Sequence, residues 1–308
     1  KIVLEALPEY LVTKDKLLEE LLEEIFENLK SCSLCPHRCG VDRLSNKVGI
    51  CGAPADAVVA SYSVHMGEEP PISGISGSGT IFFSYCTLKC IYCQNYPISQ
   101  LHNGKSVTPQ DLAQIMLYLQ ERGCHNINLV TPTHFLYSIL KAIIIAKKKG
   151  LHIPIVYNTS GWESPEIVNI LKYFVDIYLS DARYSNNKIA FVFSKAKNYR
   201  EINTESLIKM RKNQPKDLFS KNGIFLKGLI IRILVLPNYS DDAIETLKRI
   251  KENLGNKVYI SLMSQYYPCY KSLENEKLDR KITKEEYLNV LNVMKKAGFE
   301  SGWDQVYE

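Results

Sequence analysis

Seven of the nine cysteines in this 308-residue chain fall into two tight groups with the spacing of metal ligands. In a reducing compartment, clustered thiols hold a metal ion or an iron–sulfur cluster more often than they form disulfides. The other two cysteines, Cys124 and Cys269, are isolated, and we interpret them as inert thiols. The first group is Cys32, Cys35, Cys39 and Cys51, and the second is Cys86, Cys90 and Cys93.

The second group supplies three thiolates rather than four. Its spacing is C-x3-C-x2-C, and it directly follows a predicted strand. A 4Fe–4S cluster has four irons that each need a ligand, so three cysteines leave one iron open to a substrate or cofactor. A zinc ion would need a fourth ligand, and the nearest candidate, His102, lies in an unremarkable stretch of predicted surface. The spacing therefore favours an open iron–sulfur cluster.

This motif, with Tyr92 before its last cysteine, resembles the cluster motif of the radical S-adenosylmethionine (SAM) enzymes. The resemblance implies a catalytic 4Fe–4S cluster on Cys86, Cys90 and Cys93 whose open iron chelates SAM. It also implies that the reduced cluster cleaves SAM to methionine and a 5′-deoxyadenosyl radical, which abstracts hydrogen from a substrate that the sequence does not identify. An electron donor such as flavodoxin or ferredoxin would then be a partner.

The stretch from Gly77 to Asn95 is similar to the corresponding part of pyruvate formate-lyase activating enzymes. Activation of a glycyl-radical protein is therefore one candidate reaction, beside modification of a peptide, an RNA or a small molecule. Tyr85 departs from the family pattern, because glycine is usual just before the first cysteine. The turn must accept a bulky side chain, so the φ angle of Tyr85 either stays negative or is strained.

Three later segments, which follow predicted strands or lie in one, resemble the parts of these enzymes that surround SAM. Residues 158–161, Asn-Thr-Ser-Gly, are similar to Asp-Thr-Asn-Gly, and residues 181–183, Asp-Ala-Arg, to Asp-x-Lys. Arg232 begins a run that resembles Arg-x-Val-Val-x-Pro-Gly-x-Ser-Asp. A buried arginine is costly unless it is paired. We expect Arg232 to contact SAM or the cluster rather than to form a structural ion pair. Tyr266 falls near a SAM-contacting histidine of the family. The resemblance thus implies cofactor-binding roles for Tyr92, Asn95, Asn158, Thr159, Ser160, Asp181, Arg183, Arg232 and Tyr266.

The segment after the second predicted strand departs from the family. Many members carry Gly-Gly-Glu there to hold the amino group of SAM, whereas this chain has Thr131-Pro132-Thr133-His134. We include Thr131, Thr133 and His134 among the cofactor-binding residues as substitute sources of carbonyl and hydroxyl groups, although a packing role suits His134 equally well. The departure keeps a second function open, an iron–sulfur electron carrier or metal-binding scaffold without SAM turnover.

The first cysteine group can close a tetrahedron of ligands by itself. Cys32, Cys35, Cys39 and Cys51 lie within about twenty residues that are rich in turn formers. Zinc, a single iron and an auxiliary 4Fe–4S cluster all fit this spacing. The sequence therefore predicts a second metal site, which is either a structural staple or an electron-transferring cluster.

The elements that position these groups are predicted from hydrophobic periodicity. From Thr80 onward, short apolar or β-branched runs alternate with capped helices, a pattern typical of βα units around a parallel sheet. Periodicity does not separate an open doubly wound sheet from a partial barrel, but the motifs favour the barrel. We predict an α/β fold, a partial (β/α)6 TIM-like barrel with a C-terminal helix in residues 61–308, preceded in residues 1–60 by a helix and the four-cysteine segment. The predicted strands are 80–83, 126–130, 153–157, 175–179, 229–236 and 258–263; the predicted helices cover 15–30 and about 204–212 and begin near Thr108, Ser164, Ser240 and Thr283.

The overall composition is that of a globular protein, with 45% hydrophobic and 23% charged residues. The net charge of +5 is mild, so a nucleic-acid partner is not indicated. No run approaches the ~20 apolar residues of a membrane span, and Lys1 to Tyr10 do not resemble an export signal, so we expect a cytoplasmic protein with no membrane partner. Residues 67–79 could cover the active site, and residues 264–268 and 303–307 could line a substrate mouth or pack under the barrel.

Overall fold

The computed structural model describes residues 6–299 and 301–304. Its centre is a run of six parallel strands whose side chains are almost entirely buried, which explains why their sequences are nearly continuous apolar runs. Every strand predicted from the sequence is present, with ends shifted by a few residues. The six strands are β2 (Ser78–Phe83), β4 (Ile127–Val130), β5 (Ile155–Thr159), β6 (Ile177–Asp181), β8 (Phe225–Leu234) and β9 (Tyr259–Met263).

The order of these strands across the sheet is the order of the chain. Each of the six pairs in parallel with the next, from β2 to β9, and the order never reverses. A doubly wound sheet would reverse at a switch point, whereas a singly wound order curves toward a barrel. The predicted partial barrel is therefore confirmed, with all six strands ending at one edge.

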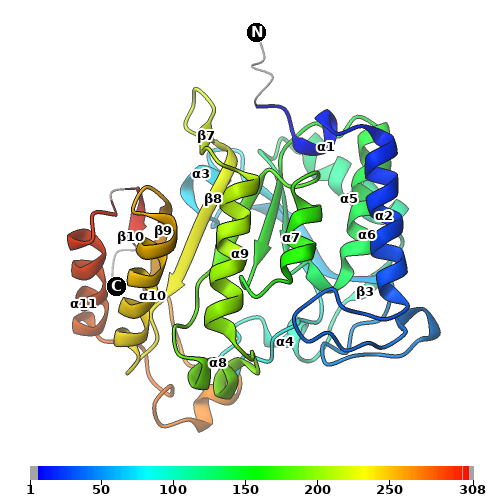
Figure 1. Cartoon of the computed structure of the whole chain (residues 1–308). Helices are drawn as coiled ribbons and strands as arrows, with labels where there is room; N and C mark the ends of the chain where they lie inside the picture. Colours follow the sequence, from blue (N-terminus) through cyan, green and yellow to red (C-terminus); the bar gives the residue numbers. More distant parts are fainter. Residues whose placement is uncertain (1–5, 300, 305–308) are drawn as a thin grey trace.

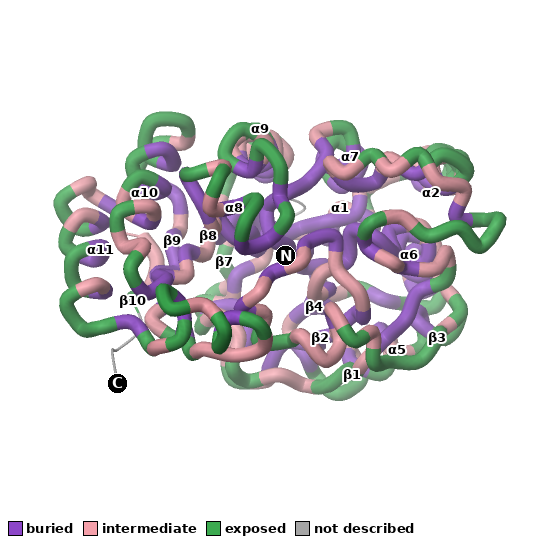
Figure 2. The backbone as a smooth tube through the Cα atoms, turned by 90° about the horizontal axis from the view of Figure 1, so that it is seen from below, coloured by how far each residue is buried: buried purple, intermediate pink, exposed green. Residues whose placement is uncertain are grey.

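Helices cover the outer face of this sheet, as Figures 1 and 2 show. The predicted capping signals mark where they begin: Thr108 and Asp111 form a capping box at the start of one helix, and Thr283 and Glu286 form another. The N-terminal helix packs on the second of the barrel helices. The helices are α2 (Asp15–Leu29), α5 (Pro109–Glu121), α6 (Leu136–Lys148), α7 (Pro165–Leu171), α9 (Tyr199–Asn213), α10 (Ser240–Leu254) and α11 (Lys284–Lys296).

Several smaller elements were not predicted. The strand β1 (Ala57–His65) pairs antiparallel with β2, and the predicted domain boundary at residue 60 falls inside it. Residues 61–63 of β1 are exposed, so β1 lacks the continuous apolar run that marks the other strands. The others are β3 (Lys105–Val107), β7 (Leu218–Phe219), β10 (Gly302–Asp304), α1 (Glu9–Val12), α3 (Pro70–Ser73), α4 (Tyr96–Ser99), α8 (Asn187–Ser194) and the 3-10 helices η2 (Arg43–Ser45), η3 (Thr133–Phe135) and η4 (Tyr270–Glu274).

The segment between β1 and β2 closes the end of the barrel where the strands begin. Ile72 of α3 is fully buried against inward-facing side chains of the strands, including Val156 and Ile230. Figure 1 places α3 at the opposite end from α4 and α8, toward which the strand arrows point. The segment thus plugs the far mouth instead of covering the active site.

Trp303 stacks on Tyr259 and packs against this same inner core, so it lies under the barrel. The other residues of that stretch, 305–307, lie outside the described residues.

A buried carboxylate joins the ends of two strands to the outer helices. Glu163 is 1% exposed, and its carboxylate accepts hydrogen bonds from Thr133 (2.8 Å) and Thr159, while its backbone carbonyl accepts one from Ser206 of α9 (3.0 Å). Burial raises the pKa of Glu163 to about 7, and the hydrogen bonds only partly oppose this shift. At neutral pH the Glu163 carboxyl group is therefore close to half ionised.

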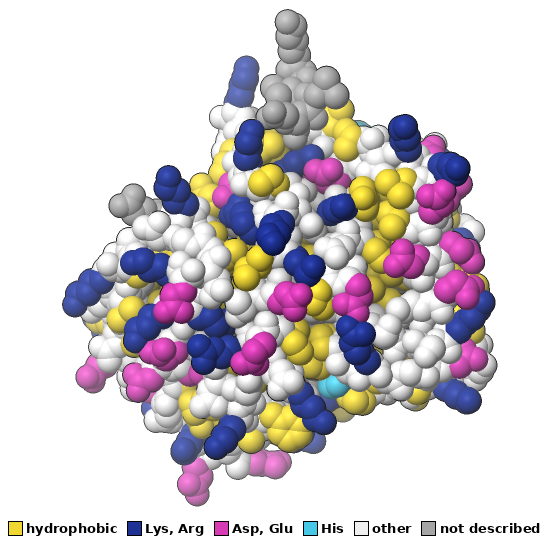
Figure 3. All heavy atoms as spheres, in the orientation of Figure 1, with side chains coloured by type: hydrophobic (Ala, Val, Ile, Leu, Met, Phe, Trp, Pro, Cys, Tyr) yellow, Lys and Arg dark blue, Asp and Glu magenta, His cyan; other side chains and the backbone are white. Residues whose placement is uncertain are grey.

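The surface carries no dominant charge on the face drawn in Figure 3, where basic and acidic side chains are interspersed. In the part of the chain that the structure describes, no helix has the length and apolarity needed to cross a bilayer.

We expect Thr108→Ala to lower the free energy of unfolding by about 1 kcal/mol, because the hydroxyl that caps the Asp111 N–H is lost. Urea unfolding would measure the change. Thr108→Ser retains the hydroxyl and is the matched control; equal destabilisation by both variants would contradict the capping role.

We also expect stability to depend on pH through Glu163. Its pKa of about 7 lies above its ordinary value, so its contribution is complete below pH 4.5 and is lost as pH rises through 7. Between pH 5 and pH 8 the free energy of unfolding should fall by about 2 kcal/mol more in the parent than in Glu163→Gln, which cannot ionise. Parallel pH profiles for the two proteins would be inconsistent with a protonated Glu163.

Candidate functional site

The three-cysteine loop begins just after β2, at the edge where the parallel strands end. Its backbone is fixed by the last two residues of α8: the N–H groups of Lys89 and Ile91 donate to the carbonyls of Ser194 (3.0 Å) and Phe193 (2.9 Å). On another side, the N–H of Ser272 in η4 donates to the Ile91 carbonyl (2.9 Å). The loop is therefore held by segments about 100 and 180 residues away in sequence.

Hydrogen-bond donors surround the sulfur atoms of this loop. Cys90 Sγ accepts from Arg183 Nη1 and Ser194 Oγ, both at 3.0 Å, and Cys93 Sγ lies 3.1 Å from Ser99 Oγ. Such donors stabilise thiolates, which are the form that binds metals. Burial raises the pKa of Cys86 to about 12, so this thiol stays protonated unless a metal takes the place of its proton. The donor set fits an iron–sulfur cluster bound by the three thiolates.

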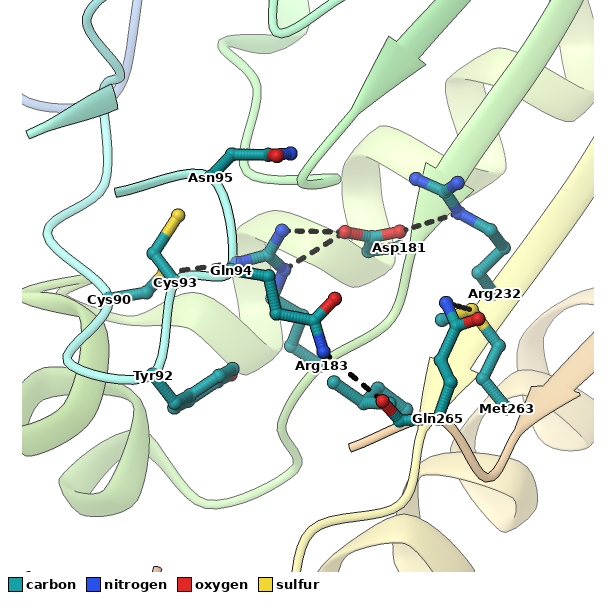
Figure 4. Close-up of a pocket in the computed structure, with 11 residues that line it drawn as sticks. Cys90, Tyr92, Cys93, Gln94, Asn95, Asp181, Arg183, Arg232, Met263 and Gln265 are labelled. Atoms are coloured by element: carbon teal, nitrogen blue, oxygen red, sulfur yellow. Dashed lines mark hydrogen bonds and ion pairs between the residues drawn. The ribbon is translucent and has the colours of Figure 1, made fainter. Parts of the chain in front are cut away.

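A cavity opens beside these thiols, at the ends of β6, β8 and β9 (Figure 4). Seven of the predicted catalytic and cofactor-binding residues line it. Gln94 and Gln265 also line it and were not predicted individually. The apolar side chains of Leu234 and Met263 form part of its wall. The complete lining is Cys90, Tyr92, Cys93, Gln94, Asn95, Asp181, Arg183, Arg232, Leu234, Met263 and Gln265.

Asp181, the last residue of β6, binds both arginines of this cavity. One carboxylate oxygen accepts from Arg183 Nε (3.0 Å) and Nη2 (2.7 Å), and the other from Arg232 Nε (2.9 Å). Burial alone would raise the pKa of Asp181, but Arg232 and Arg183 outweigh it and hold the pKa below its usual value. Figure 4 shows the resulting chain of hydrogen bonds and ion pairs, which runs from Cys90 through Arg183 and Asp181 to Arg232.

Arg232 continues this chain of hydrogen bonds into the barrel. Its two terminal nitrogens donate to Asn158 Oδ1 (2.7 Å) and Glu68 Oε1 (3.3 Å). The arginine therefore forms structural ion pairs and also lines the cavity, so the two interpretations of the sequence are not exclusive. Glu68, which also accepts from Asn128 (2.8 Å) and Asn158 (3.1 Å), was not predicted, because the turn-rich segment that carries it shows no periodicity.

The remaining predicted cofactor-binding residues do not line this cavity in the described structure. Thr133 and Thr159 bind Glu163, the Ser160 carbonyl accepts from Tyr199, and Tyr266 donates to the Leu278 carbonyl (2.6 Å). Thr131 ends β4 with φ of +57°, and its N–H donates to the Asn158 carbonyl (2.9 Å). Their roles toward a cofactor stay predictions.

The turn before Cys86 is strained. Tyr85 has φ of +66°, in the left-handed region that costs a bulky residue about 1 to 2 kcal/mol. Its N–H donates to the Ile98 carbonyl (2.9 Å), and its ring stacks on His102 at 4.0 Å. His102, which the sequence places on unremarkable surface, is thus part of the support for this turn.

The four-cysteine segment lies at the same end of the molecule, as the blue loop of Figure 1. All four of its thiols line one small cavity, together with Leu34, Arg43, Gly49 and His134. In residues 6–299 and 301–304, no three His, Cys, Asp or Glu side chains converge on one point as a single ion requires, so the thiols are spread around the wall. Burial lowers the pKa of His134 to about 3, so its ring is neutral. His134, which the sequence analysis includes among the cofactor-binding residues, lies beside the first cysteine group, and its role toward a cofactor stays a prediction.

Two hydrogen bonds join the two cysteine segments, and a third joins His134, which lines the cavity of the first group, to the start of the second. His37 Nε2 lies 2.8 Å from the Thr87 carbonyl, and Lys89 Nζ donates to the Cys51 carbonyl at 3.3 Å. His134 Nε2 lies 2.7 Å from the carbonyl of Ser84, two residues before Cys86. The two groups are therefore adjacent, although the sequence separates them by more than thirty residues.

Comparison with known proteins agrees with this geometry. The model of the radical SAM superfamily matches residues 80–250. An uncharacterised protein of Methanocaldococcus jannaschii, MJ0674, is 33% identical over 300 residues, which cover 93% of this chain and 81% of that protein. The pyruvate formate-lyase 1-activating enzyme of Escherichia coli K12 is 24% identical over 202 residues, 59% of this chain and 71% of the enzyme.

Solved structures agree at the level of the fold. HydG, a maturase of the [FeFe]-hydrogenase, superimposes with a TM-score of 0.52 at 15% identity and covers 96% of this chain. The chain spans 65% of HydG, slightly less than two thirds of its length. The match to the family model covers more than half of the chain and includes the three-cysteine loop and the ends of β4, β5, β6 and β8. The chain belongs to the radical SAM superfamily, a family that implies a 4Fe–4S cluster and SAM as cofactors.

Proposed function

We propose that this protein cleaves SAM reductively to a 5′-deoxyadenosyl radical, which abstracts hydrogen from a substrate not yet identified. The observation that carries this proposal is the loop of Cys86, Cys90 and Cys93, of which Cys90 and Cys93 line a cavity together with Asp181 and Arg232. The similarity to an activating enzyme makes a glycyl-radical protein one candidate substrate.

The residues of the chain would divide the work in the following way. A 4Fe–4S cluster held by the three cysteines supplies the electron that cleaves the sulfonium of SAM. Arg183 stabilises negative charge on the Cys90 sulfur, to which it donates at 3.0 Å. Arg232 presents a guanidinium, a group suited to a carboxylate, and Asp181 fixes the orientation of both arginines. Leu234 and Met263 exclude water from one wall of the cavity.

We also propose a second metal at Cys32, Cys35, Cys39 and Cys51, either zinc, iron or an auxiliary iron–sulfur cluster. The support is the single cavity that the four thiols share. An electron donor such as flavodoxin or ferredoxin would reduce the protein, and a cytoplasmic location would suit cysteines that must stay reduced.

We expect Cys90→Ala to reduce 5′-deoxyadenosine formation to background, because the cluster loses one of its three protein ligands. The assay is anaerobic reconstitution with iron and sulfide, followed by dithionite, SAM and chromatography of the products. Counts of iron, sulfide and zinc before the assay would define the metal content of each sample.

Cys124→Ala is the matched control, since it removes a buried thiol that lies outside both cysteine groups. It should retain the activity of the parent. Deoxyadenosine formation by Cys90→Ala at the parental rate would refute the proposed function. A parent whose cluster EPR signal does not respond to SAM would instead favour the electron carrier.

A further inference from the structure

The four-cysteine cavity contains a buried cation with no counter-charge. Arg43 is 1% exposed, and none of the ion pairs formed by the described residues includes it. Its terminal nitrogens donate to the carbonyls of His134 (2.7 Å) and Pro54, and its buried Nε has no partner among the residues that the structure describes. An unpaired buried charge is expensive, so this guanidinium needs an anion, and no carboxylate of the described residues pairs with it.

A second orphaned atom belongs to the same cavity. His134 is 2% exposed, and its Nε2 lies 2.7 Å from the Ser84 carbonyl. Because a carbonyl only accepts, Nε2 carries the hydrogen, and Nδ1 carries a lone pair. Nδ1 is also buried without a partner. Two polar atoms that lack partners thus lie on side chains that line one cavity with four thiols.

A metal bound by the four cysteines would supply the counter-charge that Arg43 lacks and an acceptor for its Nε. Four thiolates outnumber the charge of a divalent ion, and four thiolates on a 4Fe–4S cluster are likewise anionic, so either group supplies the missing negative charge. Its sulfurs can accept the hydrogen bond from Arg43 Nε.

The same residues lead directly to the catalytic loop. Arg43 binds the backbone carbonyl of His134, and the ring of His134 binds the carbonyl of Ser84, next to the strained Tyr85. On its other side the Tyr85 ring stacks on His102, and Gly52, beside Cys51, lies next to the His102 ring, since a Cβ on Gly52 would be in ordinary van der Waals contact with it at 3.5 Å. Beside the Ile98 carbonyl, two further supports of the strained turn therefore rest on the four-cysteine segment.

We propose that a metal–tetrathiolate group at Cys32, Cys35, Cys39 and Cys51 has Arg43 as its counter-charge and, through His134, holds the Tyr85 turn that positions the catalytic cysteine loop. This inference rests on the second metal site proposed above. His134 is then a positioning residue for the catalytic cluster, not a ligand of SAM.

The charge role is tested in a background in which Cys86, Cys90 and Cys93 are replaced by serine, so that only the first group can bind metal. Chelator competition and elemental analysis would measure zinc, iron and sulfide. One zinc ion, one iron, or iron and sulfide in a cluster ratio would each support the site and identify its occupant. Arg43→Gln should weaken retention of the metal at least tenfold, and Arg43→Lys, which keeps the charge, should lose much less. A background protein without metal, or unchanged retention in Arg43→Gln, would overturn the proposal.

The positioning role is tested with all seven cysteines present. His134→Leu should keep the first metal but lower the catalytic cluster content at least fivefold, or abolish the effect of SAM on its EPR signal. His134→Gln, whose amide can donate to Ser84, should restore both. A normal cluster with a normal SAM response in His134→Leu would contradict the proposal, as would equal loss in both variants. Absence of a SAM response in the parent would count against the proposed enzyme, whereas the metal counts in the serine background test this inference separately.

Discussion

The candidate site depends on one buried carboxylate shared by two guanidinium groups. Asp181 and Arg232 are register partners on the adjacent parallel strands β6 and β8, so the sheet itself brings them together. Arg183 follows two residues later and turns back to the same carboxylate. Without Asp181, two partly buried cations would lose the carboxylate that they share; removing one partner of a fully buried pair costs about 3 to 5 kcal/mol, which is an upper bound here. The carboxylate therefore fixes the position of Arg183, and through it the environment of the Cys90 sulfur.

This interaction also connects the active edge with the far end of the barrel. Arg232 reaches Glu68, and Glu68 receives the amides of Asn128 and Asn158 from two further strands. The segment that carries Glu68 leads into α3, whose Ile72 closes the opposite mouth. A polar network thus runs through an otherwise apolar sheet. Because each member is hydrogen-bonded to the next, the arrangement of the catalytic edge depends on how the opposite mouth is closed.

The sequence predicted the parts of the protein that local rules control. Six apolar runs became the six parallel strands, and the capping residues Thr108 and Thr283 marked helix starts correctly. Because all the strands end at one edge, residues just after the apolar runs, such as Asp181 and Arg183, could be expected to meet. Glu68 escaped prediction, since it contacts Arg232 across 164 residues from an irregular segment. Nor can a sequence show that Arg43 is buried without a counter-charge.

The departures of this chain from its family pattern bear on whether it retains family chemistry. Tyr85 stands where glycine is usual, and Thr131 begins the segment that replaces Gly-Gly-Glu. Both residues nevertheless have positive φ, +66° and +57°, the conformation that glycine adopts without strain. A β-branched or aromatic residue holds that conformation only when its surroundings impose it. Here the Ile98 and Asn158 carbonyls and the His102 ring do so. Both turns thus have positive φ without a glycine. The turn before Cys86 and the turn after β4 are therefore held in a conformation that carries an energetic cost, and the contacts around them must offset it.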